Sequence, residues 1–189
     1  LEQSKLETQA IRAGTNRSHE GEHAEALWLT SSHVFESCAD AEAKFSGDTE
    51  GNVYSRYTNP TVKSFELRLA ALEQAEDCVA TSSGMAAISS CCMAHLKAGD
   101  HIICSRDVFG STTILLNNFF RKFDIEISFV GLTDIAAWRE AIRPNTRLLF
   151  LESPSNPMNE VADLEALANL AHSNNALLVV DNCFCTPVL

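Results

Sequence analysis

The sequence predicts an α/β fold with a mostly parallel sheet that lies between helices. Short apolar runs recur along residues 101–180, and segments of about 8 to 13 residues with helical spacing of apolar side chains separate them. Strands that alternate with helices form βαβ units, in which successive strands run parallel. The last run, 177–180, consists of leucine and valine alone, which suits a strand that is buried on both faces of such a sheet.

The regular elements are expected from residue 60 onward. Asn59 and Pro60 predict a helix start, because asparagine caps free N–H groups and proline suits the first helical position. Apolar residues at helical spacing extend this helix to residue 75. Asp134 and Asp163 are expected to cap two later helices. We expect strands at 78–81, 101–104, 125–130, 148–151 and 177–180, and further helices at 85–96, 111–123, 135–142 and 164–170.

Residues 1–55 are expected to form an N-terminal arm that packs on a neighbouring subunit. Residues 1 to about 52 are polar and irregular, and their scattered apolar side chains show no sustained period. Such a segment cannot build a core of its own. Residues 56–189 are then the first part of an α/β domain.

The composition is that of an ordinary globular protein and excludes several classes of partner. The formal net charge of −11 argues against nucleic acid and anionic membranes, because both are negatively charged. No apolar run reaches the roughly 18 residues that a membrane span needs. The first residues lack a basic stretch followed by an apolar one, so no secretory signal is expected.

The cysteines indicate a reducing compartment. There are seven of them, an odd number, and none forms a CxxC pair. We therefore expect free, mostly buried thiols in a cytoplasmic protein and no zinc site. His19 and His23 are four residues apart and could share a helix face, but acidic neighbours favour a solvated polar segment over a metal site.

Polar or aromatic residues follow several of the predicted strands. Parallel strands place their carboxyl ends at one edge of the sheet, where open α/β folds bind ligands. The candidates at this edge are the turn 82–84, Phe109, Glu152, Asn156 and Asp181. Their coincidence indicates a binding site more strongly than any one of them does.

Each candidate also has an ordinary structural interpretation. Asp181 either caps the loop after its strand or holds a cation, and its position alone does not separate the two. The turn 82–84 fits a plain strand-to-helix turn slightly better than a phosphate site, and it matches neither the GxGxxG nor the P-loop pattern. Phe109, taken alone, fits a core residue better than a ring stacked on a ligand.

Taken together, five motifs resemble the Cys/Met-metabolism family of pyridoxal-phosphate (PLP) enzymes, which includes cystathionine γ-synthase, methionine γ-lyase and the acylhomoserine sulfhydrylases. The motifs lie at 54–61, 82–86, 109–112, 152–157 and 179–182, and the similarity extends from about residue 8 to residue 189. The resemblance implies the large domain of type I, aspartate aminotransferase-like PLP enzymes. It also implies a homotetramer built from tight dimers.

The resemblance assigns the cofactor's charged ends to two motifs. Asp181 would pair with the protonated pyridine nitrogen and keep the ring an electron sink. The backbone N–H groups of Gly84 and Met85 would hold the phosphate at a helix N-terminus, with Ser83 in the same turn.

Other roles follow from the same resemblance. Tyr54 and Arg56 would reach the phosphate of the neighbouring subunit's cofactor, and Tyr54 would assist proton transfer. Asn156 would contact the phenolic oxygen of the cofactor, Phe109 would stack on its ring, and Glu152 would orient neighbouring groups.

Phe109 departs from the family pattern, because many relatives have tyrosine there. A tyrosine can donate a proton to a leaving group and phenylalanine cannot. The resemblance therefore implies γ-replacement on O-succinylhomoserine with sulfide, which gives homocysteine and succinate in methionine biosynthesis. The alternatives are cystathionine γ-synthase, an O-acetylhomoserine sulfhydrylase and, less favoured, a methionine γ-lyase. A non-catalytic α/β binding domain is the alternative outside the enzymes.

The family's Schiff-base lysine is expected beyond Leu189, so this chain is expected to be about half of such an enzyme and its α/β domain incomplete. The lysines present lie in other contexts. They are Lys5, Lys44, Lys63, Lys97 and Lys122.

Overall fold

A computed structural model describes residues 4–188 of the 189-residue chain. The chain divides into two compact units, Leu1–Ala80 and Thr81–Leu189. The boundary expected after residue 55 marks the end of an arm that would pack on a neighbouring subunit. Both the arm and this packing remain predictions.

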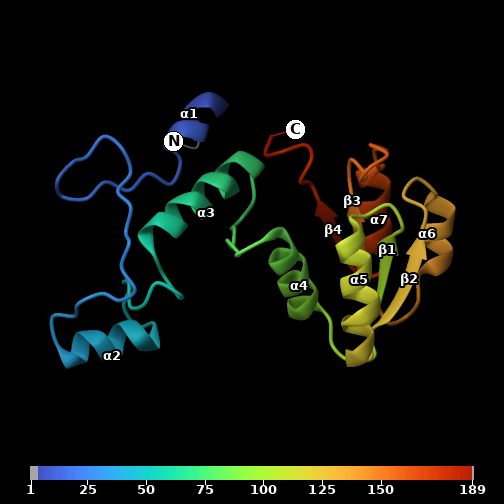
Figure 1. Ribbon diagram of the computed structural model, residues 1–189, viewed down its shortest axis with the longest axis horizontal. Helices are drawn as coiled ribbons and strands as arrows, with labels where there is room; N and C mark the ends of the chain where they lie inside the picture. The colour runs from blue at the N-terminus through green and yellow to red at the C-terminus, as the bar shows by residue number, and fades with distance from the viewer. Residues whose placement is uncertain (1–3, 189) are drawn as a thin grey trace. The chain divides into compact units, whose positions relative to one another are not determined.

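Residues 4–80 of the first unit form three helices, which Figure 1 shows as α1 (Leu6–Arg12), α2 (Cys38–Ser46) and α3 (Pro60–Glu73). The predicted start of α3 is confirmed, because the Asn59 side chain accepts hydrogen bonds from the N–H groups of Thr61 and Val62 at 2.9 and 3.4 Å. The first unit buries only small or medium apolar residues among those described. They are Ala13, Val53 and Ala70.

The expectation that the first 52 residues are irregular was wrong at α1 and α2. Helix α2 has strong local signals at both ends: Ser37 caps the N–H of Asp40, and Gly47 ends the helix with φ of +83°. Helix α1 packs against α3, where Arg68 donates to the Ala13 carbonyl at 2.9 Å. The caps of α2 and the contact of α1 with α3 stabilise these two helices, although the segment lacks apolar periodicity.

The second unit contains a four-stranded sheet in the order β2-β1-β3-β4. The strands are β1 (His101–Ser105), β2 (Glu126–Val130), β3 (Thr146–Glu152) and β4 (Leu177–Asp181). All three pairings are parallel, which confirms the predicted sheet. The remaining elements of this unit are α4 (Gly84–His95), α5 (Gly110–Asn118), the 3-10 helix η1 (Phe120–Phe123), α6 (Ile135–Ala141) and α7 (Leu164–Ser173).

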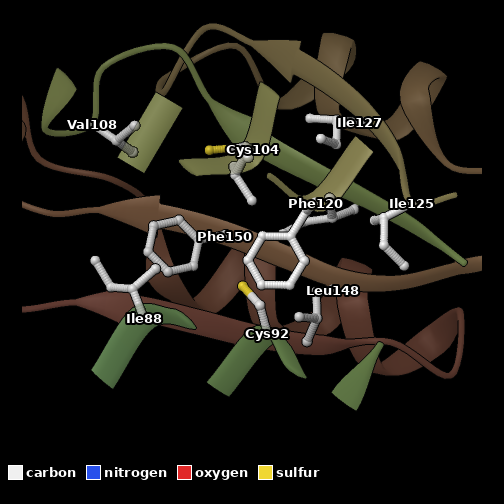
Figure 2. Close-up of a cluster of buried hydrophobic side chains, with 11 residues drawn as sticks. Ile88, Cys92, Cys104, Val108, Phe120, Ile125, Ile127, Leu148 and Phe150 are labelled. Atoms are coloured by element: carbon white, nitrogen blue, oxygen red, sulfur yellow. The ribbon is translucent and has the colours of Figure 1, made fainter. Parts of the chain in front are cut away.

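Helices cover both faces of this sheet (Figure 1). Ile102, Leu148 and Phe150 pack on the face covered by α4 and α5, and Figure 2 shows Phe150 opposite Ile88 of α4. The alternate residues Ile103 and Leu149 pack on the other face, against α6 and α7. Because side chains alternate along a strand, each position in the sheet can be assigned to one of the two faces.

The strand expected at 78–81 is not formed. A strand needs a neighbouring strand for its backbone groups, and this segment has none among the described residues. The Ala80 N–H instead donates to the Glu66 side chain at 2.9 Å, and Val79 is 79% exposed. This run of three apolar residues and a threonine was therefore too weak a signal without a neighbouring strand.

The helix expected at 111–123 is divided into α5 and η1. The chain tightens to a 3-10 turn after Phe119, a common way for a helix to end. The tighter turn directs Phe120 into the core beside α4 (Figure 2). Phe119 and Phe123 stay exposed.

All seven cysteines are free, but the expectation that most are buried was wrong. Only Cys92 and Cys104 are buried, and burial raises the pKa of Cys92 to about 12. Cys38 and Cys183 are exposed. Within residues 4–188, no helix combines the length and the apolar character needed to cross a bilayer.

A buried histidine connects three strands of the sheet. The His101 ring on β1 is fully buried, with Nδ1 2.8 Å from Oγ1 of Thr146 on β3 and Nε2 3.0 Å from Oγ of Ser128 on β2. Burial lowers its pKa from 6.5 to about 4; Arg143 lowers it further, and Glu126 partly opposes both effects. The ring is therefore neutral in the folded protein at neutral pH.

We expect acid to destabilise the full-length protein through His101. The unfolded chain binds the proton near pH 6.5 and the folded chain only near pH 4, so the stabilisation is complete above pH 6.5 and is lost as the pH falls towards 4. This pKa gap corresponds to at most roughly 3 kcal/mol. Unfolding free energies from pH 4 to 7.5 should fall less steeply for His101→Gln, and identical slopes would contradict the prediction.

Candidate functional site

The topology places two helix N-termini at the carboxyl edge of the sheet. Helix α5 follows the end of β1, so its first turn lies at that edge. Helix α4 precedes β1, and its C-terminal end leads to the first residue of β1. The N-terminus of α4 therefore lies at the carboxyl edge as well. Both helices cover the same face of the sheet, because residues of both pack with Ile102 and Phe150. The free N–H groups in the first turns of α4 and α5 thus lie near the carboxyl ends of the strands, on one face of the sheet.

Two carboxylates lie side by side at this edge. Glu152 ends β3 and Asp181 ends β4, and the two residues are partners in the parallel register. Glu152 lies two residues after Phe150, and Asp181 two residues after Val179, both of which pack on the face covered by α4 and α5. The predicted meeting of Glu152 and Asp181 at one edge is therefore observed.

Glu152 is 3% exposed and holds the start of α5. Its Oε2 accepts a hydrogen bond from the Phe109 N–H at 2.7 Å. Burial raises the pKa of Glu152, the Phe109 N–H opposes that rise, and the neighbouring Asp181 carboxylate adds to it. The Glu152 carboxylate thus accepts this hydrogen bond although burial and the neighbouring Asp181 both disfavour its negative charge.

Of the two interpretations of Asp181, the structure shows the cap of the following loop, and the cation-holding role stays a prediction. Its Oδ1 accepts a hydrogen bond from the Cys183 N–H at 3.1 Å, which is the cap of the following loop. Its Oδ2 has no protein donor within residues 4–188. One oxygen therefore fixes the turn and the other is available for a cation.

Phe109 is not the core residue that it resembled when considered alone. Its side chain is 48% exposed, whereas the preceding Val108 is 6% exposed and packs in the core. Because Phe109 is the N-cap residue of α5, its backbone turns away from the strand path and its ring stays at the surface.

The N-terminus of α4 is open towards solvent. Ser83 is its cap and accepts a hydrogen bond from the Ala86 N–H at 3.1 Å. The N–H groups of Gly84 and Met85 have no acceptor among the described residues. A Cβ atom added at Gly84 would meet nothing within 4 Å, so the backbone there is accessible to a ligand.

The loop after β3 holds Asn156 at the same edge. The hydroxyls of Ser153 and Ser155 accept hydrogen bonds from the N–H groups of Ala162 and Glu160 at 3.1 and 3.0 Å, and both serines are buried. Asn156 between them and Pro157 is half-buried, and its side chain has no hydrogen-bond partner within residues 4–188. The loop is thus held in place with a free amide.

Tyr54 and Arg56 lie in the first unit. The Arg56 guanidinium lies 5.1 and 5.3 Å from the ring centroids of Tyr54 and Tyr57. No carboxylate in the described part of the chain forms an ion pair with it. The pair is therefore a cation stacked on aromatic rings, and its role towards a cofactor remains a prediction.

The residues match a known family over nearly the whole chain. The family of Cys/Met metabolism PLP-dependent enzymes matches residues 7–189. This chain belongs to that family. The expectation drawn from the five motifs is thereby confirmed, and the geometry of the carboxyl edge can be compared with the needs of PLP.

Named relatives span the sulfhydrylases and the lyases. The chain is 56% identical over its whole length to O-succinylhomoserine sulfhydrylase of Pseudomonas aeruginosa, of which it covers 47%. It is 40% identical, again over its whole length, to L-methionine gamma-lyase of Fusobacterium nucleatum subsp. nucleatum, of which it covers 48%. The chain therefore spans about half the length of the curated relatives that it matches.

Solved structures of family members share the fold. The metB structure from Corynebacterium glutamicum matches with a TM-score of 0.88 and 32% identity over 95% of this chain and 45% of that one. A putative O-acetylhomoserine (thiol)-lyase (metY) from Campylobacter jejuni matches with a TM-score of 0.90 and 28% identity over 95% of this chain and 44% of that one, and it contains N'-pyridoxyl-lysine-5'-monophosphate at position 205. The predicted fold of the type I PLP enzymes is confirmed.

The carboxyl edge fits PLP in three respects. PLP presents a pyridine nitrogen, a flat ring and a phosphate, and it needs an anion, a stacking surface and N–H donors. The edge offers the free Oδ2 of Asp181, the exposed ring of Phe109 and the open first turn of α4 at Gly84. No cluster of three or more metal-ligating side chains exists in the part of the chain that the structure describes.

One contact of this site was missed from the sequence. The Cys183 N–H bond to Asp181 is the loop cap that was one of the two expected interpretations, because an aspartate can accept a hydrogen bond from the backbone two residues further on. The missed bond, from the Phe109 N–H to Glu152, joins residues 43 positions apart. Only the fold brings that pair together.

Proposed function

We propose that the full-length protein catalyses γ-replacement on O-succinylhomoserine with sulfide and forms homocysteine and succinate in methionine biosynthesis. The observation that supports this most directly is the 56% identity, over all 189 residues, to a protein named O-succinylhomoserine sulfhydrylase. Methionine gamma-lyases are more distant, with identities of 40% and 42% for the two from Fusobacterium nucleatum.

We infer that PLP binds at the carboxyl edge. When bound, it supplies an electron sink for the α-carbon of the substrate. The free Oδ2 of Asp181 pairs with the protonated pyridine nitrogen, because a carboxylate favours the charged form of its partner. The N–H groups of Gly84 and Met85 and the hydroxyl of Ser83 donate to the phosphate at the N-terminus of α4.

The remaining residues of the edge hold the ring in place. The exposed side chain of Phe109 stacks on one face of it. The free amide of Asn156 donates to the phenolic oxygen of the cofactor. Glu152 does not need to touch the cofactor, because its carboxylate already holds the Phe109 backbone.

Residues of the first unit complete the site of a neighbouring subunit in a homotetramer. Arg56 binds that subunit's phosphate, since a guanidinium offers a planar fork of donors and this one has no carboxylate partner among the described residues. Tyr54 contacts the same phosphate and moves a proton during the reaction. The free thiols fit a cytoplasmic location, where cysteines stay reduced.

The phenylalanine at position 109 favours a substrate whose leaving group needs no proton. Succinate leaves as a stable carboxylate, whereas a thiolate leaves more readily when an acid protonates it. Phe109 has no hydroxyl for this purpose. The site therefore suits O-succinylhomoserine better than methionine.

Phe109→Tyr is expected to shift the full-length enzyme towards methionine cleavage. A tyrosine hydroxyl at this position can protonate the departing methanethiolate sulfur, and general acid catalysis contributes about 10²-fold or more where it operates. The ratio of methionine elimination to homocysteine formation should rise by roughly tenfold or more. Phe123→Tyr changes an exposed phenylalanine on η1 and should leave the ratio as it was; an unchanged ratio in Phe109→Tyr would contradict the leaving-group argument.

The reaction is tested with purified full-length protein, PLP and O-succinylhomoserine. Sulfide and cysteine are supplied in separate reactions, and homocysteine and cystathionine are quantified. We expect homocysteine from sulfide as the faster reaction. Faster formation of cystathionine from cysteine would identify a cystathionine γ-synthase instead, and no product from either would favour a non-catalytic domain.

A further inference from the structure

The N-terminus of α5 is held by Glu152, the last residue of β3. Phe109 is the N-cap of α5, and no side chain of this helix caps its first turn. The Phe109 N–H instead donates to Oε2 of Glu152 at 2.7 Å. The end of β3 thus holds the residue that carries the exposed ring.

This arrangement is unfavourable for stability. Glu152 is 3% exposed, its register partner is the carboxylate Asp181, and no lysine or arginine in the described part of the chain forms an ion pair with it. Burying a carboxylate without a cation costs free energy, and a second carboxylate beside it adds to the cost. A neutral glutamine could accept the same hydrogen bond without that cost.

The pairing of β3 with β4 links the Phe109–Glu152 hydrogen bond to the position of Asp181. Glu152 and Asp181 are held side by side by the sheet. Because Phe109 is bonded to Glu152, a movement of Phe109 away from Glu152 is also a movement relative to Asp181. The hydrogen bond therefore connects the exposed ring to the anion at the end of β4.

We propose that Glu152 is a positioning residue, which fixes the Phe109 backbone and through it the place of the aromatic ring relative to Asp181. The inference rests on the proposed PLP site, where Phe109 and Asp181 contact the same cofactor. Its distinctive requirement is a hydrogen-bond acceptor at residue 152, not a negative charge.

The test uses the full-length holoenzyme with Glu152→Ala, Glu152→Gln and, as a matched control, Glu140→Ala on the exposed side of α6. The readouts are the dissociation constant of PLP, the visible circular dichroism of bound PLP and the thermal midpoint. Loss of one hydrogen bond should weaken PLP binding by roughly tenfold in Glu152→Ala and reduce the dichroism. Glu152→Gln keeps an acceptor oxygen, so its dichroism and affinity should remain near those of the parent, with an equal or higher thermal midpoint.

A double-mutant cycle separates positioning from general structural damage. If Glu152 acts through the Phe109 ring, Glu152→Ala should not weaken PLP binding further when Phe109 is already alanine. Additive losses in the double variant would overturn the proposal. So would parental affinity and dichroism in Glu152→Ala, or a Glu152→Gln variant that is as impaired as Glu152→Ala.

Asp181→Asn in the same assays distinguishes this inference from the proposed function. Weakened PLP binding in Asp181→Asn together with parental binding in Glu152→Ala would remove the positioning role alone. Parental binding in both variants would remove the proposed cofactor site as well.

Discussion

Replacing Asp181 with asparagine is expected to lower kcat of the full-length enzyme by about 10²–10³-fold. Asparagine retains Oδ1 as an acceptor for the Cys183 N–H, so the turn after β4 should stay intact. The neutral amide cannot favour a proton on the pyridine nitrogen, and the cofactor then withdraws electrons from the substrate less strongly. The rate of homocysteine formation at saturating PLP and O-succinylhomoserine measures the loss.

Asp134→Asn is the matched control for this change. Asp134 caps α6 through the Ala137 N–H at 3.0 Å, and asparagine caps helices as well as aspartate does. Its activity should equal that of the parent. If Asp181→Asn also retained parental activity at saturating PLP, Asp181 could not have the role that we assign to it.

The largest loss of stability is expected from Trp138→Ala. Trp138 of α6 is fully buried, and its indole N–H lies 3.0 and 3.2 Å from the carbonyl oxygens of Gly131 and Leu132. Truncation leaves a cavity in the core cluster between the sheet and α6 and α7, and it removes the donor, so the free energy of unfolding should fall by about 3–5 kcal/mol. Far-UV circular dichroism in a denaturant titration measures the change without using tryptophan fluorescence.

Trp138→Phe separates the two contributions. Phenylalanine retains much of the packing but leaves the Gly131 and Leu132 carbonyls without the indole donor. Its loss should be clearly smaller than that of Trp138→Ala, because most of the cavity is filled. Equal losses for the two variants would show that the hydrogen bonds, and not the packing, dominate the contribution of Trp138.

The strands of the second unit could be predicted because their signals are local. Continuous apolar runs identified β1, β3 and β4, and Asp134 and Asp163 marked the starts of α6 and α7, where both side chains cap the first turn. The run at 78–81 had the same local character but no strand beside it. A strand is defined by its partner, and that information is absent from a segment of four residues.

The common edge where Glu152 and Asp181 lie could be predicted from the sequence, but the contacts within that edge could not. The position of Asp181 and Glu152 at strand ends predicted a common edge, since the carboxyl ends of parallel strands lie together. Phe109 is exposed at the N-cap of α5, where its N–H donates to Glu152. Such a contact joins distant parts of the chain and has no sequence period or capping pattern.

The most direct test of the central claim is the protonation state of the pyridine nitrogen in the full-length holoenzyme. PLP labelled with ¹⁵N at this nitrogen reports the state through its NMR chemical shift. We predict a protonated nitrogen in the parent enzyme at neutral pH and a deprotonated one in Asp181→Asn. An unprotonated nitrogen in the parent, or an unchanged protonated one in Asp181→Asn, would contradict the pairing of Asp181 with the cofactor.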